Sequence, residues 1–178
     1  MAHSTPPHDY DAPDTFVVSE PAQLRALGDE VRTRIVGLLR ERAASASELG
    51  ELLEMPKGTV GHHLKVLERA GLIHVVRTRQ VRAVTEKYYG RVGRLFLIQS
   101  QDELVHGVAA ASFNAVAAEL GASPEIAMHA HVRVRLRPTD ARRFNRRLDK
   151  LVTDARAAEV AEGETWGFAT ALYRLGSS

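Results

Sequence analysis

The stretch "PKGTVGHHLKVLERAGLI", residues 56–73, places small and hydrogen-bonding side chains at helical spacing. On a helix with roughly 3.6 residues per turn, these side chains share one side. That side comprises Gly58, His62, Lys65 and Arg69, flanked by Lys57, Thr59 and Gly61. Short residues near the helix N-terminus allow close approach, the helix dipole there favours phosphate, and His62 and Lys65 can reach base edges. The pattern predicts a helix that fits the major groove of DNA; the alternative is an ordinary solvated face.

The opposite side of this helix is apolar. Val60, Leu64 and Leu67 lie within about 60° of one another at helical spacing, which predicts a seam buried in a core. His63 leans toward this seam, so we expect it to pack or to contact a phosphate rather than to read a base. Adjacent His62 and His63 point about 100° apart and cannot chelate one metal ion on a helix.

Three further helices are predicted before this one. Pro21 suits a first helical turn, and Asp29 can cap a second helix. Ser45 and Glu48 have the spacing of a capping box, which predicts a short third helix in "SASELGELLEM". A short helix, a turn containing Met55 and Pro56, and the helix at 56–70 together predict a helix-turn-helix.

A basic hairpin follows. Two β-branched runs, Ile73–Val76 and Val81–Thr85, predict strands, joined by a loose turn over Arg77–Gln80 that lacks the Gly or Asn of tight turns. Residues 57–87 hold seven Lys or Arg against two Glu, an excess of five positive charges that suits a polyanionic partner. The candidate contacts with the DNA backbone or minor groove are Arg77, Arg79, Gln80 and Arg82.

Residues 21–89 resemble the winged helix-turn-helix of ArsR-type bacterial transcription regulators, most specifically in "GTVGHHLKVLERAGLI". The resemblance implies a homodimeric repressor whose helix 56–70 enters the major groove of double-stranded DNA. Gly61 stands where the family often has Ser or Thr, so one hydroxyl contact is missing, and a glycine in mid-helix costs about 1 kcal/mol. The metal-sensing members carry a Cys-x-Cys pair where this chain has "SELGELLEM", which excludes metal sensing by thiolates.

Several classes of function find no support in the composition. The chain has no cysteine, and no Gly-rich phosphate loop, nucleophile motif or spaced carboxylate pair indicates an enzyme. His129 and His131 have acceptable spacing for metal ligands, but two ligands are too few, so we expect neither a metal nor a cofactor. We expect no window to be apolar enough to span a membrane, and no secretory signal is visible, which favours the cytoplasm.

The two ends of the chain differ from the middle. We interpret residues 1–18 as a disordered acidic tail. Beyond Tyr89, "GRVGRLFLI" fits a strand or a helix start, and residues 101–120 predict an Ala-rich helix. Strict alternation over Met128–Arg137 predicts a half-buried strand, Pro138 starts a basic helix (138–159), and "ETWGFATALYRL" predicts a last strand.

The predicted fold is α+β and mainly α: a winged helix-turn-helix domain (19–89) and a C-terminal unit (90–178) of two helices and two strands. Two strands make a poor sheet, so we expect this unit to pair with its copy, joined by residues 21–27 and 101–120. The unit is also a candidate for effector binding. Trp166, Phe168 and Tyr173 favour core or dimer packing over a pocket, and the basic face of the late helix favours solvation over a second nucleic-acid surface. The alternatives to a DNA-binding repressor are a winged-helix module that binds proteins and an RNA-binding protein.

Overall fold

The computed structural model describes residues 9–81, 84–100, 102–160 and 163–175. The described chain forms two compact units, residues 9–122 and residues 123–175, and each is treated separately. The boundary differs from the one predicted after Tyr89. Helix α5 (Leu104–Ala122) belongs to the first unit, because Val108 and Ala111 are buried in contact with the first two helices.

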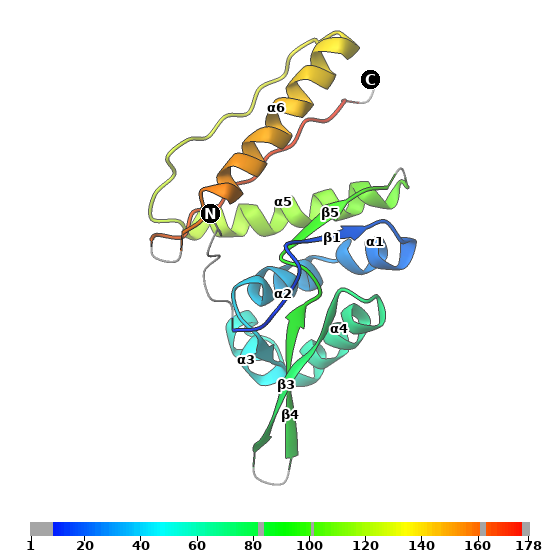
Figure 1. Ribbon diagram of the computed structural model, residues 1–178, viewed down its shortest axis with the longest axis vertical. Helices are drawn as coiled ribbons and strands as arrows, with labels where there is room; N and C mark the ends of the chain where they lie inside the picture. The colour runs from blue at the N-terminus through cyan, green and yellow to red at the C-terminus, as the bar shows by residue number, and fades with distance from the viewer. Residues whose placement is uncertain (1–8, 82–83, 101, 161–162, 176–178) are drawn as a thin grey trace. The chain divides into compact units, whose positions relative to one another are not determined.

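The first unit begins its helical part as predicted (Figure 1). Its helices before the hairpin are α1 (Pro21–Leu27), α2 (Glu30–Glu41), α3 (Ala46–Leu53) and α4 (Lys57–Arg69). The Asp29 carboxylate accepts a hydrogen bond from the Arg32 amide at 2.9 Å and so caps α2. Ser45 and Glu48 form the predicted capping box at the start of α3. Local capping chemistry therefore determines where these helices begin.

A long hairpin follows α4. Strands β3 (Ile73–Val81) and β4 (Val84–Arg91) pair antiparallel, and the short β2 (Ala44–Ser45) joins the other edge of β4. The prediction of a turn over Arg77–Gln80 was wrong: these residues continue β3, with Arg79 opposite Glu86. The ladder bulges after Val75 and then continues to its end, so the strands are longer than their β-branched cores indicate.

The segment before α1 is folded against the hairpin. Strand β1 (Thr15–Val18) pairs in parallel with β5 (Leu95–Ile98), the stretch that sequence alone left ambiguous. Residues 9–18, which we call the N-terminal arm, thus differ from the predicted disordered tail, whose residues 1–8 lie outside the described chain. The arm is ordered because it has apolar anchors: Val18 is fully buried and the rings of Phe16 and Phe96 pack 5.8 Å apart.

The core of the first unit lies between the helices and the root of the hairpin. Each helix from α1 to α4 contributes buried leucines, and the hairpin contributes Ile73 and Tyr89. The largest fully buried side chains in this core are Leu24, Ile35, Leu39, Leu49, Leu64, Leu67, Leu72 and Ile73. This shared core holds α3 and α4 in place as one pair.

Helix α5 is more apolar than the sequence reading allowed. By length and composition alone it could cross a membrane, with a mean hydropathy of 1.2. One side of it packs on α1 and α2, whereas the apolar residues Phe113 and Leu120 are 43% and 42% exposed. The helix therefore joins the first unit by one face and leaves a second apolar face uncovered.

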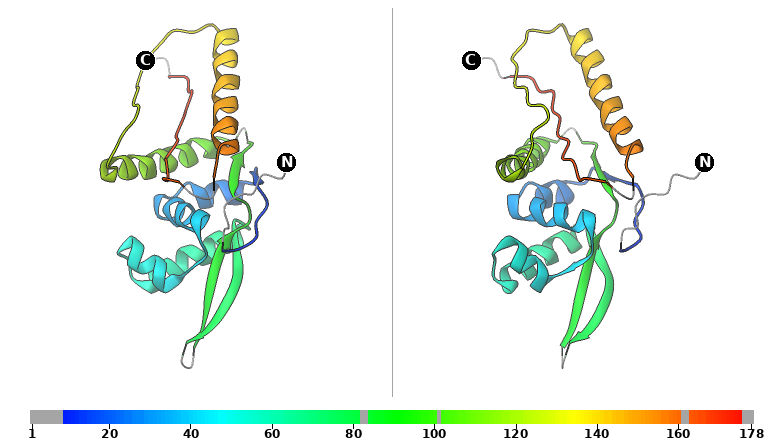
Figure 2. Two further views of the ribbon diagram at one scale, coloured as in Figure 1. Left: turned by 60° about the vertical axis from the view of Figure 1, so that its left-hand side comes forward. Right: turned by 90° about the vertical axis from the view of Figure 1, so that its left-hand side faces the viewer.

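The second unit contains α6 (Pro138–Ala157), which begins at the predicted proline. The predicted strands at Met128–Arg137 and in "ETWGFATALYRL" are absent: both described segments are extended but form no β-ladder. Figure 2 shows them running alongside α6 in the direction opposite to the helix. Alternation only marks a segment as able to pair, and neither segment pairs with described residues of its own chain.

Candidate nucleic-acid interface

Helix α4 is held by its apolar seam. Val60 and Leu67 are fully buried and Leu64 is 1% exposed. Pro56 stands at the N-cap and supplies no side-chain cap, and the first turn carries no acidic side chain. The seam anchors the helix in the core and turns its other side outward.

The turn between α3 and α4 depends on one close approach. Glu54 adopts the left-handed conformation (φ 54°) and the Met55 amide donates to the Gly50 carbonyl at 2.8 Å. A Cβ at Gly50 would lie 2.8 Å from the Met55 carbonyl oxygen, so only glycine fits there. The sequence reading did not identify this residue, although it sets how tightly α4 follows α3.

The predicted contact residues of α4 lie largely on its exposed side. Those classed as exposed are Lys57, Gly58, Thr59, His62, Lys65 and Arg69, and Gly61 is half-buried. Apart from the adjoining residues and the backbone of α4 itself, no described atom lies within 4 Å of a Cβ built at Gly58 or Gly61. The structure thus brings these side chains together on one helix and leaves space above its two glycines.

His63 lies elsewhere. Its side chain is 14% exposed, and Nδ1 lies 3.8 Å from the Asp29 carboxylate at the start of α2. Burial lowers the pKa of His63 and outweighs the nearby carboxylate, with Arg32 and His62 adding to the lowering. A neutral, packed imidazole joins α4 to α2, which favours the packing role over base reading.

In the hairpin, the outer residues are accessible. Arg79 and Gln80 are exposed, and Gln80 accepts a hydrogen bond from the Thr85 hydroxyl at 2.9 Å. Arg82 lies outside the described residues. The outer half of the hairpin therefore presents a guanidinium and an amide.

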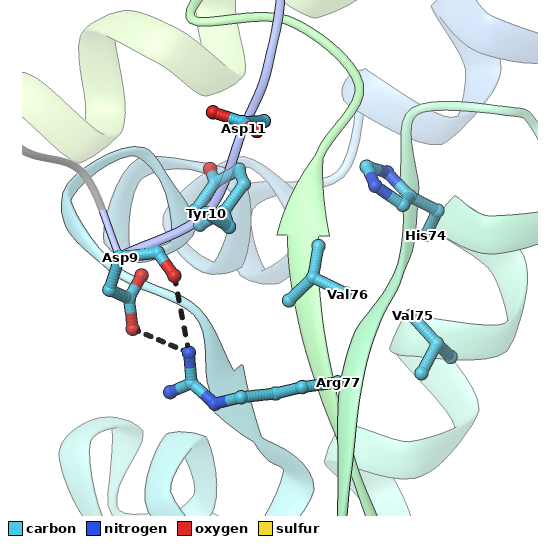
Figure 3. A pocket seen from close by; sticks show the side chains of 7 residues that line it. All are labelled: Asp9, Tyr10, Asp11, His74, Val75, Val76 and Arg77. Atoms are coloured by element: carbon cyan, nitrogen blue, oxygen red, sulfur yellow. Dashed lines mark hydrogen bonds and ion pairs between the residues drawn. The ribbon is translucent and has the colours of Figure 1, made fainter.

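Arg77 is engaged by the N-terminal arm (Figure 3). Its Nη1 donates to the Asp9 carboxylate at 2.9 Å, and its guanidinium lies 4.7 Å from the centre of the Tyr88 ring. The same carboxylate accepts from the Ala43 amide at 2.7 Å. The arm and the hairpin line a surface hollow of about 400 Å³. Arg77 is thus compensated by an acidic group of its own chain.

Tyr10 completes the attachment of the arm. Its hydroxyl donates to the Leu39 carbonyl and accepts from the Arg91 amide. Its ring packs on Gly90, where a Cβ would lie 2.8 Å from ring carbons. Sequence reasoning missed Asp9 and Tyr10 because their partners are distant in sequence; the aromatic residue amid acids was the only signal.

Arg91 is the buried cation of this region. It is 6% exposed, its guanidinium stacks 4.1 Å from the centre of the Phe96 ring, and burial lowers its pKa to about 10. It therefore stays charged at neutral pH, stabilised by the aromatic face. Among the described residues, no group of three or more His, Asp or Glu could hold a metal ion.

Comparison with known proteins decides the type of domain. Residues 27–76 match the family model described as "Helix-turn-helix domain", which spans α2, α3, α4 and the start of β3. This chain carries a helix-turn-helix domain. With the hairpin beside it, the domain is a winged helix-turn-helix, the predicted fold. This match agrees with the helix-turn-helix part of the resemblance drawn from the sequence.

Several solved structures resemble parts of the chain. HlyU from Vibrio cholerae N16961 is 28% identical, over 39% of this chain and 71% of its own, with a TM-score of 0.33. The homodimeric winged helix-turn-helix DNA-binding domain Mb0332 from Mycobacterium bovis, a possible ArsR-family regulator, is 19% identical, over 62% of this chain and 86% of its own (TM-score 0.34). HlyU from Vibrio vulnificus CMCP6 is 23% identical, over 54% of this chain and 83% of its own, with a TM-score of 0.33. The search of curated proteins gives no match.

Proposed function

We propose that the protein is a sequence-specific regulator of transcription, a dimeric repressor that reads a palindromic DNA operator. The observation that carries the proposal is the exposed polar side of α4 above its buried seam. A helix about 10–12 Å in diameter fits a major groove about 12 Å wide when its entering side is small and polar. His62 and Lys65 then face base edges, and Lys57 and Thr59 face the phosphates.

The hairpin supplies the second contact. Arg79 and Gln80 lie in its outer half and are exposed, so they can follow the sugar–phosphate backbone or the minor groove. Arg77 lies nearer the root and is paired with Asp9, so we assign it a smaller share of DNA affinity. His63 serves the packing of α4 in this proposal.

A palindrome requires two copies. Helix α5 leaves Phe113 and Leu120 exposed beside other apolar residues, and α1 packs against it. We infer that α1 and α5 of two copies pair, because burying an uncovered apolar face stabilises a dimer. Two copies of α4 would then read half-sites about 34–36 Å apart, or a multiple of that. The function is non-catalytic and places the protein in the cytoplasm with the DNA.

The test begins with duplexes selected from a random pool by the full-length protein. His62→Ala should weaken binding to the selected duplex by roughly 1–3 kcal/mol and relax the preference at one base position. His74→Ala, an exposed histidine at the root of the hairpin, is the matched control and should leave the preference unchanged. Arg79→Ala should weaken binding to all duplexes about equally and reduce the salt dependence by about one counterion.

The same assay separates the alternatives. Arg146→Ala, on the exposed side of α6, should leave duplex binding unchanged. Equal affinity for random duplex and single strands, lost in this variant, would instead indicate an RNA-binding protein. No affinity for any nucleic acid would favour a protein-interaction module, and a monomer at micromolar concentration would refute the dimer.

A further inference from the structure

The second unit has no core of its own. No described residue from 123 to 175 is buried, although the segments on either side of α6 are rich in apolar side chains. Met128 is 84% exposed, Val132 73%, Trp166 56% and Tyr173 65%. A unit of this size needs most of its apolar surface covered to offset the entropy of ordering. The apolar side chains of this unit must therefore be buried by residues outside it.

The two extended segments are equipped for strand pairing. Residues 128–136 and 165–175 form no β-ladder within the described chain, so their backbone N–H and C=O groups can pair with another strand, whereas the Arg137 carbonyl already accepts from the first turn of α6. Both run in the same direction along α6 (Figures 1 and 2). Another strand can pair with an extended backbone that has one apolar side: the main chains then form hydrogen bonds, and the apolar side chains become buried.

Charge selects which segments pair. The polar side of 128–137 carries His129, His131, Arg133, Arg135 and Arg137. Two copies of this segment side by side would place like charges opposite one another, which is destabilising. Segment 165–175 has a single charged residue, Arg174, and accepts the basic segment without repulsion. A basic strand at the outer edge of a sheet also discourages further association.

A second copy of the chain is the partner that fits. It supplies both kinds of segment, so the same cross-pairing occurs twice about one two-fold axis. The dimer proposed above would tether the two units directly after α5, at an effective concentration near the millimolar range for a short connection. We propose that residues 128–137 of one copy pair with residues 165–175 of the other, and that this pairing buries Trp166. The inference rests on the proposed dimer.

Trp166 makes the proposal measurable, because it is the only tryptophan in the chain. In the full-length dimer, its fluorescence should be blue-shifted and protected from acrylamide, and both features should disappear on dilution to monomer. Val132→Glu, on the apolar side of the segment, should expose the tryptophan. Arg133→Glu, the next residue on the polar side, is the matched control and should leave it protected.

A cross-link tests the pairing without relying on these substitutions. The chain has no cysteine, so Arg133→Cys protein can be mixed with Ala171→Cys protein, whose cysteine lies on the strand face opposite Trp166, and treated with a short bis-maleimide. Cross-links between the two variants should exceed those within the Arg133→Cys population several-fold. An excess of cross-links within that population would overturn the proposed pairing.

Two fluorescence results would also overturn it: an exposed Trp166 in a stable dimer, or a protected Trp166 in a monomer. Failure of the proposed function is distinguishable from these. A protein that selects no operator but protects Trp166 on dimerisation refutes DNA recognition alone. A dimer that binds its operator with an exposed Trp166 refutes the strand pairing alone.

Discussion

The two units show the same kind of sequence pattern with opposite outcomes. In residues 9–122, apolar periodicity corresponds to burial, and Leu64 of α4 is 1% exposed. In residues 123–175, an equally regular alternation leaves Val132 73% exposed. The difference is that the first unit contains the partners of its own amphipathic elements. A periodic apolar face thus indicates that its side chains need to be buried, but it does not indicate whether the same chain or another chain buries them.

The largest expected effect tests how much the burial of a side chain within one chain contributes to the free energy of unfolding. Leu64→Ala should lower the free energy of unfolding by about 2–5 kcal/mol, because it removes a fully packed side chain from between α4 and the core. Leu52→Ala, at a 50% exposed position of α3, is the matched control and should change it by less than about 0.5 kcal/mol. Urea denaturation followed by circular dichroism measures both. Equal losses at the two sites would show that the core is not organised around α4.

The second test asks whether the N-terminal arm belongs to the folded unit. A Cβ at Gly93 would lie 2.5 Å from Phe16 Cβ and 3.0 Å from the Phe16 amide nitrogen. Gly93→Ala must therefore displace β1, and we expect a loss of about 1–3 kcal/mol in the free energy of unfolding.

Gly61→Ala is the same substitution at a position where a Cβ meets no described atom within 4 Å outside the adjoining residues and the backbone of α4. It should stabilise the protein by up to about 1 kcal/mol, since alanine favours the helix. Thermal unfolding of both variants provides the comparison. A neutral Gly93→Ala would mean that the arm is detached in solution and that residues 9–18 behave like the predicted tail.

These cases also show how far the sequence predicts the fold. Helix starts were predictable because capping is local: Asp29 and Ser45 bond to groups three residues away. Strands β1 and β2 could not be predicted in this way, because each is short and is defined by its pairing with a strand distant in sequence. The segment at Met128–Arg137 shows the converse, since its strong local pattern has no partner among the described residues of the chain.

The candidate site divides in the same way. The exposed side of α4 follows from helical periodicity, so the exposure of His62 and Lys65 could be predicted from sequence alone. The Asp9–Arg77 ion pair joins residues 68 positions apart, and nothing local indicates it. The sequence did not indicate that position 50 requires glycine for a related reason: the Met55 carbonyl that excludes a Cβ there comes close only in the folded chain.

The smallest expected effect concerns the packed histidine of α4. Burial lowers the pKa of His63 below its ordinary value of 6.5, so the folded protein favours the neutral ring. Its contribution to stability is complete above pH 6.5, the pKa in the unfolded chain, and is lost as the pH falls from there through the lowered folded value.

The pH dependence follows from the groups that surround this ring. Asp29 attracts a proton to His63, whereas Arg32 and His62 repel it, and burial decides the direction. Between about pH 8 and pH 5, the wild type should therefore lose more of its free energy of unfolding than His63→Gln does. His74→Gln, at an exposed histidine outside this group, should follow the wild type. Urea denaturation at a series of pH values measures the three slopes. If His63→Gln lost stability as steeply as the wild type, the ring would be solvated in solution, and α4 would be joined to α2 by its apolar seam alone.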